Sequence, residues 1–85
     1  MNKLITIISY NTASNSQLAG LCQLLSVFKP SFVFLQEVAL NSVRLNSVIG
    51  SSYEGESNLD NEAPNRPGTA VLWRKGLDVS VVNLL

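Results

Sequence analysis

A continuous apolar run followed by a carboxylate constrains this chain more than any other feature. The run Phe32–Leu35 comes directly after Lys29-Pro30 and ends in Gln36-Glu37. Four consecutive aromatic or branched apolar residues are typical of a strand that is buried on both faces. An earlier run, residues 4–10, has the same character and ends in Asn11. The sequence therefore predicts two buried strands, residues 4–10 and 31–37, each of which ends in a polar side chain.

A helical pattern lies between these strands. It starts at Asn15 or Ser16, either of which suits an N-cap, and Lys29 and Pro30 end it. The residues expected to face the core are Leu18, Leu21, Cys22, Leu25 and Phe28, with Ala19, Leu24 and Val27 widening the stripe. Strand, helix and strand in succession favour parallel neighbours that are joined by a right-handed crossover. The carboxyl ends of such strands share the edge at which open α/β sheets bind ligands, so Asn11 and Glu37 are predicted to face one site.

The rest of the chain predicts a second helix, a loop and two more strands. Asn41 or Ser42 suits the cap of a short helix with Val43, Val48 and Ile49 directed inward, and Gly50 suits the left-handed position at its C-terminal end. Residues 51–53 are predicted as a short edge strand, and 54–66, which are polar and aperiodic, as a surface loop. Residues 69–73 and 77–82 predict two strands joined in a hairpin at Lys75-Gly76. One sheet with both helices on one face would leave its other face uncovered.

Composition limits the possible functions. At 85 residues the chain is at most one domain, and its formal net charge of +0 gives no overall field toward nucleic acid or anionic membrane. No apolar run approaches the roughly 20 residues of a membrane-spanning helix, so we expect no membrane partner. The single cysteine, Cys22, cannot form an internal disulfide, which fits a reducing compartment. Histidine, the commonest general base near neutral pH, is absent.

Three segments together resemble a known family. Residues 8–11, 29–37 and 66–72 are similar to the N-terminal part of the endonuclease/exonuclease/phosphatase superfamily, and most similar to the apurinic-type endonuclease domains of non-long-terminal-repeat retrotransposons. The resemblance covers most of this chain but only the opening portion of that family's domain. It implies an α/β fold, the N-terminal portion of a four-layer αββα sandwich, with one mixed sheet and helices on one face. Residues 1–85 are accordingly interpreted as a partial domain whose C-terminal part is absent.

The resemblance also implies a chemistry. Members of the superfamily cleave phosphoester bonds with a divalent cation, Mg²⁺ or Mn²⁺. Glu37 matches the family's metal-binding glutamate and Asn11 its active-site asparagine, so both are predicted as catalytic residues and as metal ligands in the complete domain. Mg²⁺ prefers hard oxygen ligands and typically takes one or two carboxylates, which agrees with these roles. DNA as a partner and an intracellular location, nuclear or cytoplasmic, follow from the resemblance alone.

The sequence departs from the family pattern in two respects. Ser31 occupies a position that is usually Asp, a change expected to affect local hydrogen bonding more than chemistry. The family's later Tyr, its Asp with an Asn, and the closing Asp-His pair that activates water have no counterpart here. Asp60 and Asp78 do not match these positions. The chain alone is therefore expected to be inactive as an enzyme.

Three functions remain open at this point. The first is the N-terminal fragment of a divalent-metal-dependent phosphodiesterase, most nearly a retrotransposon-type DNA endonuclease. The second keeps the fold but acts as a phosphatase or on a lipid or an RNA tail. The third is a non-catalytic remnant or binding module whose open sheet face docks on the missing half of the domain, on another partner or on a second copy. Arg66 and Arg74 are weak candidates for phosphate contacts, and Trp73 and Tyr53 fit packing better than base stacking.

Overall fold

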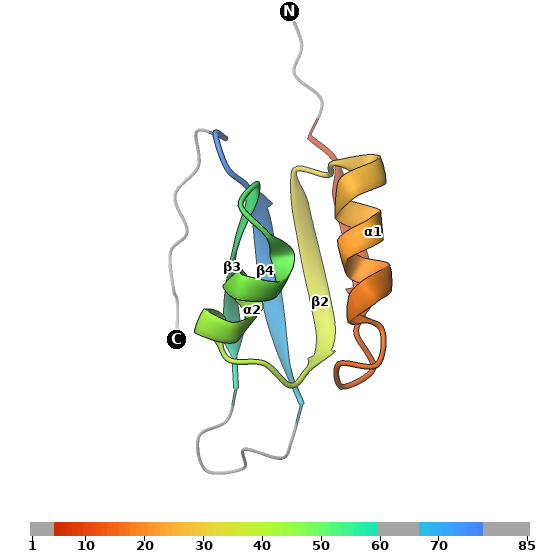
Figure 1. Cartoon of the computed structure of the whole chain (residues 1–85), viewed down its shortest axis with the longest axis vertical. Helices are drawn as coiled ribbons and strands as arrows, with labels where there is room; N and C mark the ends of the chain where they lie inside the picture. Colours follow the sequence, from red (N-terminus) through yellow and green to blue (C-terminus); the bar gives the residue numbers. More distant parts are fainter. Residues whose placement is uncertain (1–4, 60–66, 78–85) are drawn as a thin grey trace, which may run out of the picture.

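The computed structural model describes residues 5–59 and 67–77, which form a four-stranded sheet with two helices on one face (Figure 1). The elements are β1 (Ile7–Asn11), α1 (Leu18–Phe28), β2 (Phe32–Val38), α2 (Ser42–Ile49), β3 (Tyr53–Asn58) and β4 (Gly68–Arg74). The strand order is β1-β2-β4-β3; β1 and β2 are parallel, and β4 is antiparallel to both of its neighbours. The predicted α/β class, with one mixed sheet and helices on one face, is confirmed.

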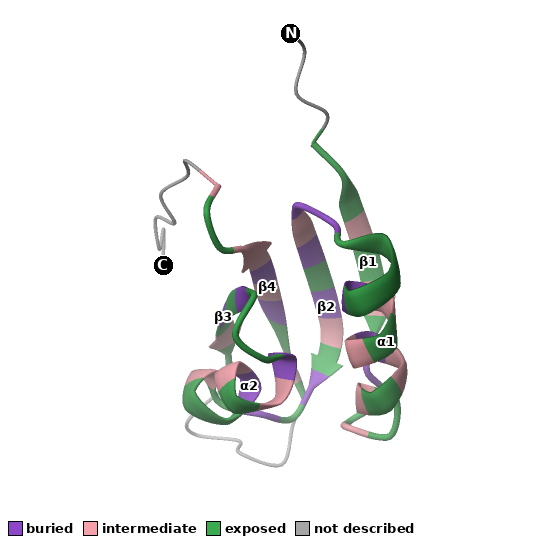
Figure 2. Ribbon diagram, turned by 45° about the horizontal axis from the view of Figure 1, so that its top comes forward, coloured by how far each residue is buried: buried purple, intermediate pink, exposed green. Residues whose placement is uncertain are grey.

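The core lies between the sheet and the two helices (Figure 2). Side chains two residues apart on a strand share a face, and the buried positions of β2 and β4 follow that period. Each helix contributes a stripe of buried residues one turn apart. The central residues of this core are Val33 and Leu35 of β2, Ala70 and Leu72 of β4, Leu21 and Leu25 of α1, and Leu45 and Ile49 of α2.

The opposite side of the sheet, which we call the open face, carries Ile7, Phe32, Phe34, Val71 and Trp73. Strand pairing sets Ile7, Phe32 and Trp73 in one cross-strand row and Phe34 beside Val71 in the next. No described element covers this face, and Ile7 and Phe34 are 60% and 48% exposed. An apolar surface of this kind usually marks a site of contact with another layer or partner.

Helix α1 begins later than the sequence predicts. It starts at Leu18, and its N-cap residue Gln17 makes no side-chain capping bond, so the predicted cap at Asn15 or Ser16 was wrong. The turn before the helix uses left-handed residues instead. Phe28, which was predicted to face the core, is 69% exposed. It has the right helical spacing, but it lies in the last turn of α1, where the core ends and the chain turns away through Lys29 at φ 47°.

Helix α2 has the predicted start and most of the predicted inward face, because Ile49 is buried and Val48 packs against the core. The Asn41 side chain accepts a hydrogen bond from the Arg44 N–H at 2.9 Å, which is the N-cap that the sequence predicts. The buried residues are Leu45 and Ile49, whereas Val43, which was predicted to point inward, is 81% exposed. A two-turn helix buries one i, i+4 stripe, and the cap at position 41 places Val43 outside it. Gly50 ends the helix at φ 87° and ψ −173°, an extended positive-φ conformation rather than the left-handed one predicted.

Most of strand β3 is not predicted by the hydrophobic pattern of the sequence. Only residues 51–53 were predicted as strand and 54–58 as loop, but β3 spans Tyr53–Asn58 and pairs along its length with β4. Its residues alternate between buried Tyr53 and Gly55 and exposed Glu54 and Glu56, and a buried glycine gives no hydrophobic signal. The Asn46 side chain of α2 donates to the Gly55 carbonyl at 2.8 Å and accepts from the Gly55 N–H at 3.0 Å. These bonds pair backbone groups at the sheet edge that no neighbouring strand reaches.

The remaining boundaries differ by smaller amounts. β1 runs from Ile7 to Asn11 rather than over residues 4–10, and β2 ends one residue after Glu37. β4 matches its predicted range closely. The second strand of the predicted hairpin, residues 77–82, lies outside the described residues except for Leu77, which is not in a strand. Neither helix in the described part of the chain is long and apolar enough to cross a bilayer.

The close contact at the start of β4 gives a test of this architecture. A Cβ atom on Gly68 would overlap the backbone carbonyl of Asn58, which β3–β4 pairing holds in place. We expect Gly68→Ala to lower the free energy of unfolding by about 2 kcal/mol or more, because a backbone atom rather than a flexible side chain must move. Chemical denaturation measures the change.

Thr69→Ala is the matched control, since Thr69 is exposed and next in sequence. It should cost less than about 1 kcal/mol, the span of strand propensity. Equal losses in the two variants would contradict the close approach of β3 to Gly68.

Candidate functional site

Asn11 and Glu37 lie side by side where β1 and β2 end. The parallel register pairs Asn11 with Gln36, and Asn11 Nδ2 donates a hydrogen bond to Glu37 Oε2. Both side chains are exposed at the carboxyl edge of the sheet. The adjacency that the sequence predicts for these two groups is therefore confirmed, while their catalytic and metal-binding roles stay predictions.

A β-bulge directs Glu37 to this edge. Leu35 pairs with Ala70 and Val38 pairs with Gly68, so Gln36 and Glu37 together oppose one residue of β4. In a regular strand Glu37 would share the core face with Leu35. The extra residue returns Val38 to the core and turns Glu37, at φ 53°, away from it. Bulges of this kind commonly re-aim side chains beside functional sites.

Thr12 fastens the loop after β1 to this bulge. Its side chain is fully buried, and its hydroxyl lies 2.8 Å from the Glu37 carbonyl and 3.2 Å from that of Gln36. The Thr12 N–H donates to the Gln36 carbonyl at 3.0 Å, and the Ser14 N–H donates to the Glu37 carbonyl at 2.9 Å. The backbone of Glu37 is thus held in a conformation that a residue with a Cβ adopts only at some cost.

The loop itself is strained in the same way. Ala13, Ser14 and Asn15 all have positive φ angles, 47°, 51° and 83°. The Gln17 N–H donates to the Thr12 carbonyl at 3.0 Å and closes the turn ahead of α1. This tight turn takes the place of the predicted helix start, and it is what brings Thr12 and Ser14 onto the end of β2.

The orientation of the Asn11 amide is set by its neighbours. The Ala13 N–H donates to Asn11 Oδ1 at 2.8 Å, so the amide oxygen faces the loop and the NH₂ group faces Glu37. The opposite orientation would place two donors against each other at Ala13. Asn11 therefore holds the Glu37 carboxylate from one side and keeps one lone pair of its oxygen for another ligand.

Two further polar residues continue the site onto the open face. Gln36 Nε2 donates to Ser9 Oγ at 2.7 Å, across the same pair of strands. Ser9, Thr12 and Gln36 are not among the site residues predicted from the sequence. Ser9 and Gln36 could have been found from strand alternation, because each shares a face with a predicted site residue or lies next to one. Nothing in a single sequence distinguishes Thr12 from an ordinary loop threonine.

The donor set meets the minimum for a divalent cation. Glu37 supplies one exposed carboxylate, and Mg²⁺ typically uses one or two, with water and substrate oxygens completing its shell. Within residues 5–59 and 67–77, no group of three or more His, Cys, Asp or Glu side chains could hold a metal ion. Glu37 is thus the best candidate for a direct ligand, and Asn11, whose NH₂ faces the carboxylate, is better placed to orient it.

The other residues considered from sequence lie away from this edge. Arg74 is at the opposite end of the sheet, where its Nη1 donates to the Lys29 carbonyl at 2.7 Å. Tyr53 is buried and donates to the Pro30 carbonyl, so its predicted packing role is confirmed. Trp73 is half-buried on the open face beside Phe32. Arg66, Asp60 and Asp78 lie outside the described residues.

Ser31 has a structural role between α1 and β2. It is buried, its hydroxyl accepts from the Thr6 N–H at 3.1 Å, and its own N–H donates to Thr6 Oγ1 at 3.0 Å. These bonds tie the start of β2 to the residues before β1. Ser31 thus takes part in local hydrogen bonds, and it lies at the end of β2 opposite Glu37.

No protein-family model matches the chain, and neither does any curated protein or solved structure. The resemblance to the endonuclease/exonuclease/phosphatase superfamily therefore stays a prediction.

The role of Thr12 is open to a direct test. Thr12→Val keeps the shape of the side chain but removes the hydroxyl that bonds to the Glu37 carbonyl. We expect the free energy of unfolding to fall by about 1 kcal/mol, the usual net contribution of one hydrogen bond. Denaturant titration of both variants should show Thr12→Ser, which keeps the hydroxyl, closer to the wild type. An unchanged stability of Thr12→Val would contradict a stabilising role of the hydroxyl.

Proposed function

We propose that this chain is the N-terminal part of a divalent-cation-dependent phosphodiesterase, and that Glu37 and Asn11 form one corner of its active site. The observation that carries the proposal is the hydrogen bond from Asn11 Nδ2 to Glu37 Oε2 across the ends of two parallel strands. Ligands of α/β sheets bind at this edge. The sequence resemblance adds the reaction class, phosphoester cleavage, and DNA as the substrate.

Each of the two residues has a distinct role in this proposal. Glu37 would hold Mg²⁺ or Mn²⁺ through its carboxylate, which the bulge and Thr12 keep at the sheet edge. A bound divalent cation polarises the scissile phosphate and stabilises the leaving oxygen. Asn11 orients the carboxylate, and its neutral amide adds a hydrogen-bond donor without adding negative charge that would repel a phosphate.

The open face supports the interpretation as a partial domain. Its two rows, Ile7-Phe32-Trp73 and Phe34-Val71, are apolar across β1, β2 and β4, as on an inner face of a β-sandwich, and they end at Glu54 and Glu56 on the edge strand β3. We propose that a second sheet, formed by residues outside this chain, packs on the open face and completes the four-layer sandwich. Because Asn11 lies at the rim of that face, the covering sheet would bring its own strand ends to the same site.

In this proposal, the groups that activate water belong to the second sheet. The chain has no histidine. Among the described residues, the other carboxylates are Glu54 and Glu56, and both lie on β3, which β4 separates from β2. Neither is placed to act as a general base beside Glu37. The described residues therefore supply the proposed cation ligand, and none of them supplies a base beside Glu37.

The two other functions differ in substrate or in class. A same-fold phosphatase, or a phosphodiesterase acting on lipid or RNA, would share the Glu37 site and differ in its substrate loops. A binding module would use the open face and leave Glu37 without a cation. The exposed apolar side chains Ile7 and Phe34 favour this second alternative, and cation binding at Glu37 separates it from the phosphodiesterase.

Cation binding provides the test of the proposal. We expect calorimetric titration of the chain with Mn²⁺ to show a weak site that Glu37→Gln weakens at least about tenfold, because the substitution removes the one carboxylate that the described residues place there. Glu56→Gln, an equally exposed glutamate with the same charge change, is the matched control and should leave binding unchanged. Equal effects of the two substitutions would contradict the proposed site.

The catalytic part of the proposal predicts a negative result for this chain alone. Supercoiled plasmid incubated with the pure chain and Mg²⁺ should remain intact, because the general base is supplied elsewhere. Gel electrophoresis detects nicking. Nicking that requires Mg²⁺ and disappears in Glu37→Ala would show that residues 1–85 hold a complete active site. That result would contradict the proposal that a second sheet supplies the general base.

A further inference from the structure

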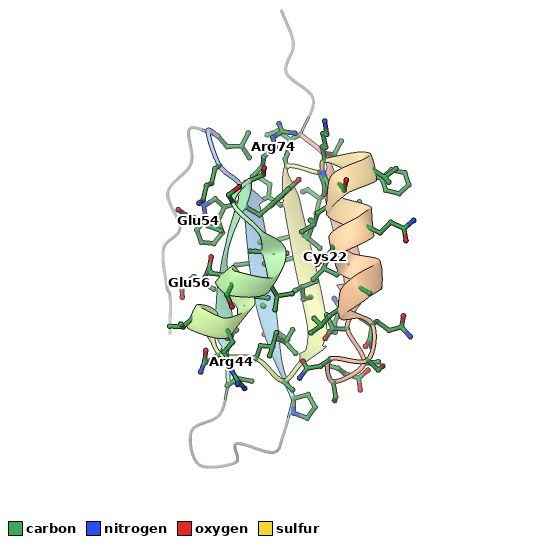
Figure 3. All side chains as sticks on the ribbon, viewed as in Figure 1. Cys22, Arg44, Glu54, Glu56 and Arg74 are labelled. Atoms are coloured by element: carbon green, nitrogen blue, oxygen red, sulfur yellow. The ribbon has the colours of Figure 1, made fainter. Side chains whose placement is uncertain are left out.

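A second candidate site lies at the end of the sheet opposite Glu37. A cavity of about 400 Å³ opens between the last turns of α1, the turn that joins α2 to β3, and the end of β4. Figure 3 shows Arg74 at this end of the sheet and Cys22 between α1 and the sheet. Both residues line the cavity. Its volume falls within the range of small-molecule sites, roughly 300 to 1,000 Å³.

The charge of the cavity is positive. Lys29 and Arg74 line it, and no carboxylate does so among the described residues. The guanidinium of Arg74 is held in place because Nη1 donates to the Lys29 carbonyl at 2.7 Å. Burial raises the pKa of Tyr53, another lining residue, and the positive charge of Arg74 opposes that rise. Tyr53 and Arg74 are cross-strand partners on β3 and β4, and both line the cavity.

Hydroxyl groups surround these two cations. Ser26 comes from the last turns of α1, and Ser51 and Ser52 come from the turn before β3. None of these hydroxyls bonds to another described residue, and neither does the ammonium of Lys29. The cavity thus offers three hydroxyl donors, an ammonium and the remaining N–H groups of a guanidinium, which has five in all.

The helix ends use only part of the hydrogen-bonding capacity of these cations. α1 and α2 both end beside the cavity, and the partial negative charge at helix C-termini attracts cations. The Lys29 N–H already donates to the Leu25 carbonyl at 3.1 Å, the thiol of Cys22 lies 3.4 Å from the Val48 carbonyl, and one N–H of Arg74 bonds to the Lys29 carbonyl. No other contact within residues 5–59 and 67–77 uses the Lys29 ammonium or the remaining Arg74 donors, and the proposal assigns these groups to a ligand.

We propose that this cavity binds the phosphate group of a small organic phosphate. Lys29 and Arg74 pair with the anion, and the serine hydroxyls donate to its oxygens. A phosphate matches this donor set better than a carboxylate, because it has more oxygens to accept from so many donors. The apolar part of the lining, Leu25, Ile49 and the ring of Tyr53, contacts the organic portion of the ligand. The site is independent of the cation site at Glu37.

The experiment is a titration of the ¹⁵N-labelled chain with phenyl phosphate at constant ionic strength. We expect saturable shifts of the amide resonances of Cys22, Ser51, Ser52 and Arg74. Arg74→Gln should weaken binding about tenfold, the usual effect of losing a hydrogen bond to a charged group. Arg44→Gln is the matched control, because Arg44 is an exposed arginine outside the cavity. Equal weakening by the two variants, or shifts that do not saturate, would overturn the proposal.

The single cysteine provides a readout that needs no variant. Cys22 is half-buried in the lining, so bound phenyl phosphate should slow its reaction with a thiol reagent. An unchanged rate at saturating phenyl phosphate would contradict binding in this cavity, even if Arg74→Gln did not fold.

Two comparisons establish the class of ligand. The apolar lining predicts that phenyl phosphate binds more tightly than inorganic phosphate, and equal affinities would overturn the assignment to an organic phosphate. An oligonucleotide without terminal phosphates should not displace phenyl phosphate. Displacement would assign the cavity to a nucleic-acid backbone and contradict a small-molecule site.

Discussion

The parallel pairing of β1 with β2, continued past the strand ends by the loop after β1, is the constraint on which the candidate site depends. The loop residues Thr12 and Ser14 donate hydrogen bonds to the Glu37 carbonyl, and Asn11 donates to its carboxylate. Every one of these bonds crosses from the β1 side to the end of β2. They hold Glu37 in a left-handed conformation and keep its side chain out of the core. The position of the carboxylate is thus a property of two strand ends together and not of β2 alone.

The sheet gives the two faces and the two ends of the molecule different properties. One face is covered by α1 and α2, and the other carries the apolar rows around Phe32 and Phe34. One end holds Glu37 and Asn11, where a cation is proposed, and the other holds Lys29 and Arg74 around a cavity, where an anion is proposed. The net charge of the chain is +0, so its composition does not indicate that negative and positive groups lie at opposite ends of the sheet. Local geometry, not total charge, determines what each end can bind.

Hydrophobic periodicity predicts the parts of the fold whose stability comes from burial. It locates both helices, β1, β2 and β4, and the strand ends that bring Asn11 beside Glu37. It locates only the Tyr53 end of β3, because the rest of that strand is held by Asn46 and by pairing with β4 rather than by apolar side chains. It also cannot show how the site is fixed, since the bulge at Glu37 and the bonds from Thr12 depend on which backbone groups meet after folding. The inward positions of Val43 and Phe28 fail for a related reason, because spacing alone does not show where the covered part of the sheet ends.

The most direct measurement of the central claim is paramagnetic relaxation by Mn²⁺, recorded on the amide resonances of the ¹⁵N-labelled chain. Relaxation by a bound paramagnetic ion falls steeply with distance, so it locates the ion without any substitution. We predict that the strongest broadening falls on the amides of Asn11, Ala13 and Glu37, with little effect at the Tyr53 end of β3, which pairs with Arg74 at the opposite end of the sheet. Broadening centred on Glu54 and Glu56, or spread evenly over the surface, would contradict a cation site at the joined ends of β1 and β2.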